Sequence, residues 1–132
     1  MRSSRVHLPL EALSWFGLLG APVAWTVTHV LGYGLTEATC DPAGTRWSIA
    51  LDGWTVALTA VAAAIAALAG LAALVAFRRT REVEGVGGPE EPPPKGRIHF
   101  LAVVGIAISP LFLAIIVMDG LGVVLLPSCV QS

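Results

Sequence analysis

The sequence predicts an all-α integral membrane protein with three transmembrane helices, and two observations carry this prediction. Hydrophobic residues make up 55% of the 132-residue chain and charged residues only 13%, a balance outside the range of soluble domains. The apolar residues are gathered in three long runs, and each approaches or exceeds the roughly 20 residues that an α-helix needs to cross a bilayer. We therefore expect residues 1–132 to form a single membrane domain.

The three predicted helices cover residues about 12–35, 54–77 and 98–126. Residues 82–96, which join the second helix to the third, contain Gly-Val-Gly-Gly and three consecutive prolines, a composition typical of a mobile, solvated linker. A secretory signal peptide is the alternative for the first run, because two arginines precede it. The run is longer than the roughly 7–15 residue apolar core of a signal peptide, which favours a permanent helix.

Basic residues predict the orientation of the chain. When the N-terminus is placed in the cytoplasm, Arg46 is the only basic residue on the outer side, as the positive-inside rule prefers. The C-terminus is then outside and the linker is cytoplasmic. The basic residues on the cytoplasmic side are Arg2, Arg5, Arg78, Arg79, Arg81, Lys95 and Arg97.

Two cysteines follow predicted helices on the outer, oxidising side. Cys40 comes after the first helix and Cys129 after the third, which favours a disulfide between the outer ends of these two helices. Metal binding, as in a copper-delivery protein, is the alternative. Two cysteines without a nearby array of histidines or methionines indicate a metal site only weakly, and we expect none.

A polar stripe runs along the first helix. His29 lies four residues from both Trp25 and Tyr33, and this spacing places all three side chains on one helical face. Polar groups within a membrane are costly, so His29 is a candidate site residue. Asp119 is the only acidic residue inside an apolar run of the sequence, and it is the second candidate.

The positions of these two residues predict a contact between the first and third helices. Cys40 follows His29 by eleven residues and Cys129 follows Asp119 by ten. At about 1.5 Å per residue, His29 and Asp119 both lie roughly 10 Å below their helix ends. We expect a hydrogen-bonded or ionic pair, and the equally weighted alternative is that each side chain is solvated separately near the interface.

The second predicted helix is rich in alanine and carries packing rather than chemistry. Ala62, Ala66 and Gly70 repeat at four-residue spacing and predict a smooth face on which another helix can approach closely. Thr55 and Thr59 continue this face outward. Further packing or kink positions are expected at Gly20, Gly32, Gly105, Pro22 and Pro110.

Catalysis is not expected, because the chain has no clustered nucleophile, base and orienting group and no phosphate-binding glycine motif. We therefore expect no catalytic residue and no cofactor. A haem bound at His29 would need a second axial ligand from a partner chain, since His7 and His99 lie on the opposite side of the membrane.

The first and third helices resemble small, uncharacterised bacterial three-span membrane proteins encoded alongside haem-copper cytochrome c oxidase subunits. The first helix carries the likeness in Gly20-Ala-Pro-Val-Ala-Trp25, followed by His29, Tyr33 and Cys40. The third carries it in Phe100-Leu-Ala-Val-Val-Gly105, Ser109, Phe112 and Leu-Leu-Pro127-Ser-Cys129. The second helix, the linker and Asp119 are not covered.

This resemblance implies a multi-pass protein of the bacterial inner membrane that associates with a terminal oxidase as a non-catalytic subunit or assembly factor. Its expected partners are membrane lipid and the subunits of a larger complex, with no role for nucleic acid. A haem- or quinone-binding electron-transfer subunit is one alternative, with His29 and either Tyr33 or Trp25 lining the site. A small transporter or metal-delivery component is another.

Overall fold

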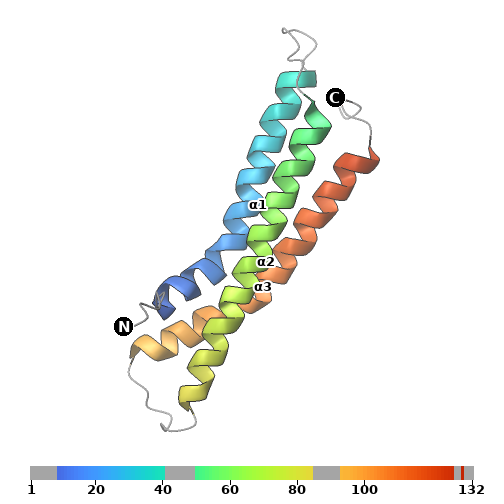
Figure 1. Cartoon of the computed structure of the whole chain (residues 1–132). Coiled ribbons are helices and arrows are strands. Elements are labelled where there is room, and N and C mark those ends of the chain that lie inside the picture. The colour runs from blue at the N-terminus through green and yellow to red at the C-terminus, as the bar shows by residue number, and fades with distance from the viewer. Residues whose placement is uncertain (1–8, 41–49, 85–92, 127–128, 130–132) are drawn as a thin grey trace, which may run out of the picture.

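The computed structural model describes residues 9–40, 50–84, 93–126 and 129, and it confirms the predicted all-α fold over these ranges. Three helices lie side by side along most of their length: α1 (Leu10–Cys40), α2 (Leu51–Glu84) and α3 (Pro93–Leu125) (Figure 1). Each helix is long and apolar enough to cross a membrane. These spans indicate a multi-pass membrane protein.

All three helices begin earlier than the apolar runs of the sequence, and α1 and α2 also end later. The α2 helix continues to Glu84 and α3 begins at Pro93, so helix occupies both ends of the segment predicted as a linker, and residues 85–92 lie outside the described residues. Backbone hydrogen bonds do not depend on apolar side chains, so a helix can continue into polar flanks. Prolines in the first turn of α3 cost no helical hydrogen bond, since N–H groups there have no intrahelical acceptor.

The bundle has two ends that differ in chemistry. The N-terminus of α1, the C-terminus of α2 and the start of α3 lie together at the lower end of Figure 1, which we call the arginine end after Arg78, Arg81 and Arg97. The opposite end, where α1 and α3 finish, is the cysteine end. Both α1 and α3 bend along their length in this view, and each contains an internal proline, Pro22 or Pro110.

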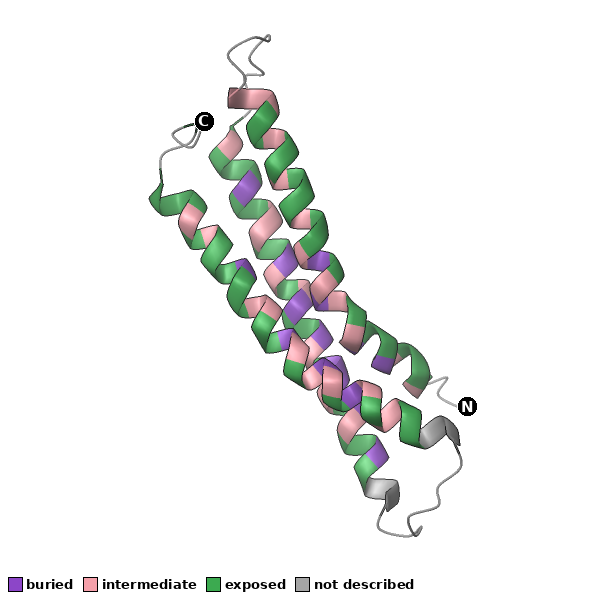
Figure 2. Ribbon diagram, turned by 180° about the vertical axis from the view of Figure 1, so that it is seen from behind, coloured by how far each residue is buried: buried purple, intermediate pink, exposed green. Residues whose placement is uncertain are grey.

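The interior of the bundle is built almost entirely from small residues, and Figure 2 shows how the buried positions are distributed along the three helices. Among the described residues, Ile116 is the one large apolar side chain that is buried, and the other buried apolar residues are alanines. Bulky side chains such as Leu111, Met118 and Val30 are instead more than 60% exposed. A bundle in lipid has no hydrophobic force between its helices, so small residues that let backbones approach closely stabilise it.

All three helices meet in tight contact at Gly17, Ala73 and Gly105. A Cβ atom at Gly17 would lie 2.8 Å from the Cβ of Ala73, and one at Gly105 would lie 2.9 Å from the carbonyl oxygen of Gly17. Ser109 donates a hydrogen bond of 3.2 Å to this same carbonyl. We call this contact the glycine junction.

The alanine face of α2 packs inward. Ala62 and Ala66 are 2% and 1% exposed, and a Cβ at Gly70 would lie 3.4 Å from the Cβ of Ser109. Beyond Ala66 the most deeply buried positions are Ala69, Ala73 and Ala76. Their spacing of three and four residues follows the 3.6-residue turn more closely than a strict four-residue repeat does.

Candidate functional site

The cysteine end carries a covalent tie between α1 and α3. Cys40, the last residue of α1, is bonded to Cys129, which follows α3, and their Cα atoms are 5.4 Å apart. This separation lies within the usual range for disulfides, in agreement with the sequence prediction. The bond fixes how far α1 can slide along α3.

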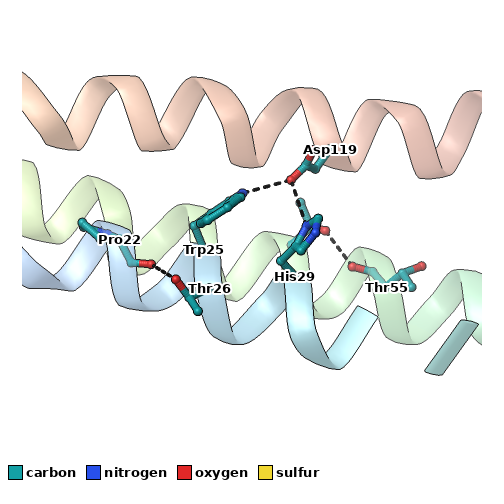
Figure 3. A network of polar contacts seen from close by, with 7 residues as sticks. Pro22, Trp25, Thr26, His29, Thr55 and Asp119 are labelled. Carbon is teal, nitrogen blue, oxygen red and sulfur yellow. Dashed lines mark hydrogen bonds and ion pairs between the residues drawn. The ribbon is translucent and has the colours of Figure 1, made fainter. Parts of the chain in front are cut away.

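Three predicted site residues meet on the seam between these two helices (Figure 3). The indole Nε1 of Trp25 donates a hydrogen bond of 3.2 Å to Oδ2 of Asp119. His29 Nδ1 lies 4.0 Å from the same oxygen, beyond hydrogen-bond distance. The structure thus brings His29 and Asp119 together, but the hydrogen bond to the carboxylate comes from Trp25.

Aromatic contacts hold the side chains of Trp25 and His29 in place. The rings of Trp25 and His29 are stacked with centroids 5.2 Å apart and planes inclined at 26°, as the spacing of one helical turn allows. Phe112 of α3 meets the indole at 5.7 Å and 58°. The indole is therefore held between a residue of its own helix and one of α3, with its N–H aimed at Asp119.

The three side chains of Trp25, His29 and Asp119, which we call the polar group, lie within the apolar part of the span. Gly120, next to Asp119, packs against α2 so closely that a Cβ there would lie 2.6 Å from Cγ2 of Thr59. Thr59 is five residues inward from the exposed Trp54, about 7–8 Å along the helix. Tryptophan marks the membrane interface, and Trp25 is the central residue of α1. The carboxylate is thus placed below the interface.

This polar group is open to the surroundings of the bundle. The side chains of His29 and Asp119 are 62% and 52% exposed. Tyr33, one turn further along α1, is 67% exposed and continues the stripe. Any lipid or protein that covers the seam between α1 and α3 will therefore contact the imidazole and the carboxylate directly.

A second polar contact, at the arginine end, was not predicted from the sequence. His99 Nδ1 lies 2.9 Å from the hydroxyl of Thr80, and the imidazole stacks on Phe77 with centroids 5.1 Å apart. Thr80 is only 8% exposed. The pattern of apolar residues along one helix does not show which residues of two different helices will meet. The only signal for this contact in the sequence was a histidine near the start of the third helix and a threonine near the end of the second.

Charged groups at the arginine end are paired across helices as well. Arg97 of α3 donates to Glu11 of α1 at 2.9 Å, and both side chains are more than half exposed. Arg78, Arg79 and Arg81 are exposed at the end of α2. Arg2, Arg5 and Arg46, on which the predicted orientation also depends, lie outside the described residues.

An apolar groove of about 530 Å³ runs between α1 and α2, on a different side of α1 from the polar stripe. Gly20 contributes to it, and bulky side chains of both helices line it, including Trp15, Leu19, Val61 and Ile65. Such a surface suits acyl chains or an apolar helix. Within the described ranges, no three histidine, cysteine or acidic side chains lie close enough to hold a metal ion.

Comparison with known proteins finds no matching family model, no matching curated protein and no matching solved structure. The chain therefore has no demonstrated link to oxidase-associated proteins.

Proposed function

We propose that the chain is a non-catalytic subunit or assembly factor of a larger complex in the bacterial inner membrane. The observation that carries this proposal is the exposed His29 and Asp119 pair within the apolar span. A carboxylate in a transmembrane helix costs up to roughly 2.5–3.5 kcal/mol on insertion scales, a value that holds for the helix centre and is an upper bound for Asp119, which lies closer to the end of α3. One hydrogen bond from Trp25 offsets this only in part, so contact with another protein surface would stabilise the seam.

The orientation belongs to the same proposal. The bundle end at which α2 finishes and α3 begins carries the basic residues Arg78, Arg79, Arg81 and Arg97. The positive-inside rule assigns this end to the cytoplasm. The disulfide between Cys40 and Cys129 then lies on the oxidising side, where such bonds persist.

A terminal oxidase is the partner suggested by the resemblance of the first and third helices. The residues of that resemblance include Trp25, His29 and Cys40 of α1, Phe112 of α3, and Cys129 after α3. These residues take part in the polar group or in the disulfide at the end of the same two helices. The resemblance therefore covers part of the region that we propose as the contact, although it does not include Asp119.

Purification in a mild detergent tests this proposal. The tagged full chain is isolated from its native membrane, and the co-purifying proteins are identified by mass spectrometry. We expect oxidase subunits with the wild type, several-fold fewer with Asp119→Asn, and no change with Val27→Ala, a control in the groove on the other side of α1. Recovery of no oxidase subunit, under conditions that keep the oxidase itself intact, would remove it as the partner.

A cofactor-binding electron-transfer subunit is the second candidate, favoured by the free edge of His29. Within the described residues the imidazole makes no hydrogen bond, and its side chain is 62% exposed. It could therefore act as a haem ligand or donate to a quinone. An absorbance spectrum of the purified protein separates the candidates, since a Soret band would demonstrate haem and contradict a purely structural role.

A further inference from the structure

The seam between α1 and α3 leaves polar atoms of two side chains unsatisfied. Over the residues that the structure describes, the carboxylate of Asp119 accepts one hydrogen bond, at Oδ2 from Trp25, and its Oδ1 accepts none. His29 Nδ1 approaches Oδ2 only to 4.0 Å. In lipid, which offers no hydrogen bonds, each unsatisfied group favours a partner from another chain.

The same seam has glycines that the bundle does not use. Gly32 follows His29 by three residues and Gly122 follows Asp119 by three, and a Cβ at either position would meet nothing within 4 Å. Gly17 and Gly120, in contrast, are in tight contact inside the bundle. Small residues in a membrane let another helix approach closely, and here they lie one turn from the unsatisfied polar groups.

The exposed face that carries His29 and Asp119 is complementary to the same face of a second copy of the chain. A neutral imidazole carries one N–H donor, and a carboxylate accepts through two oxygens. His29 and Asp119 therefore place a donor and an acceptor side by side on one exposed face, 4.0 Å apart. A second copy of the chain necessarily offers the acceptor for the first donor and the donor for the first acceptor.

Membrane geometry favours this second copy over an unrelated helix. A two-fold axis along the membrane normal leaves each residue at its own depth. His29 and Asp119 are at nearly the same depth within one chain, so they are also at matching depth between two copies related by such an axis. In a two-fold dimer, the commonest closed symmetry among soluble oligomers, each contact occurs twice.

We propose that the seam between α1 and α3 is the interface of a homodimer, in which His29 of one copy pairs with Asp119 of the second copy and reciprocally. Gly32 and Gly122 allow the facing helices to approach. The proposal shares with the proposed function only the premise that protein covers this seam, and it does not depend on which larger complex the chain joins.

Fluorescence energy transfer between full-length copies in phosphatidylethanolamine and phosphatidylglycerol vesicles tests the dimer. Donor and acceptor fluorescent proteins are fused to the N-terminus, and the protein is diluted in lipid to obtain the dissociation constant. We expect His29→Ala and Asp119→Ala each to weaken the dimer about ten-fold, because each variant loses both reciprocal contacts. Val27→Ala, in the groove between α1 and α2, is the matched control and should have no effect.

Mixing the two variants shows whether the contact is between chains. With the donor on the His29→Ala copy and the acceptor on the Asp119→Ala copy, only mixed dimers give a signal. Each mixed dimer keeps one intact pair, so it should bind about three-fold more tightly than either variant binds itself. Equal affinities for mixed and unmixed variants would overturn the proposal, because they would indicate a contact within one chain.

A variant that leaves the folded monomer intact completes the test. Gly122→Leu has open space around it in the single chain, so the disulfide and the unfolding temperature should be unchanged while energy transfer falls. Wild-type protein without energy transfer at any density overturns the dimer and leaves the co-purification result untouched. Complementation by the mixed variants, together with recovery of no oxidase subunit, supports the dimer and contradicts the proposed function.

Discussion

Replacement of Gly17 by alanine is expected to destabilise the bundle, although alanine favours a helix more than glycine does. The added Cβ would lie 2.8 Å from the Cβ and 2.9 Å from the Cα and N of Ala73. These are backbone atoms or the first side-chain atom of a neighbour on α2, so no flexible group can rotate away. Overpacking of this kind costs about 1–3 kcal/mol, against a gain in helix propensity of up to about 1 kcal/mol.

The glycine junction adds a further loss. Separation of α1 from its neighbours also strains the hydrogen bond from Ser109 to the Gly17 carbonyl, and an interhelical bond of this kind contributes about 0.6 kcal/mol in membranes. The net expectation is a fall of about 0.5–2.5 kcal/mol in the free energy of unfolding.

Unfolding in mixed micelles of decyl maltoside and dodecyl sulfate, followed by circular dichroism with the disulfide intact, measures this change. Gly32→Ala on the same helix is the control, because a Cβ there meets nothing within 4 Å, and it should be neutral or stabilising by up to about 1 kcal/mol. If Gly17→Ala were as stable as Gly32→Ala, the close packing of α1 on Ala73 would be refuted.

Three further predictions concern other contacts of the bundle. Reduction of the disulfide should lower the free energy of unfolding by about 2–4 kcal/mol, whereas a Cys129→Ser variant should not respond to reductant. Thr80→Val should cost about 0.5–1.5 kcal/mol in the same unfolding assay, since it removes the interhelical partner of His99; a neutral result would contradict that contact. Glu11→Gln should change stability by less than about 1 kcal/mol, and by still less at high salt, because its pair with Arg97 is exposed.

The sequence was sufficient to predict the number of helices and the cysteine pair, since both follow from hydropathy and topology alone. It was not sufficient for the helix ends, because hydropathy reports where a side chain is apolar and not where a backbone stops being helical. Glu84 and Pro93 are helical in the structure although they lie in a polar, proline-rich stretch.

The contacts of the polar group were likewise predicted only in part. Nearly equal spacing from the cysteines, eleven and ten residues, predicted that His29 and Asp119 would be neighbours. Residue counts give depth but not the rotation of each helix about its axis. The indole N–H of Trp25 reaches the carboxylate first. A buried or membrane-embedded tryptophan usually requires an acceptor, and its position one turn from His29 was the signal that could have identified it.

The small residues between the helices and the polar side chains on the outside of the bundle have different roles. The glycine junction and the alanines of α2 set the distances between helices. The polar contacts of Trp25, His29 and Asp119 lie on the outside of the bundle, where the imidazole and the carboxylate are more than half exposed. The same tight packing and the disulfide hold α1 and α3 in one register, so the imidazole and the carboxylate are presented at a constant separation. A polar pair that is already held at matched depth loses less conformational entropy on association than a mobile pair does, and this favours the seam between α1 and α3 as the surface for the contacts that we propose.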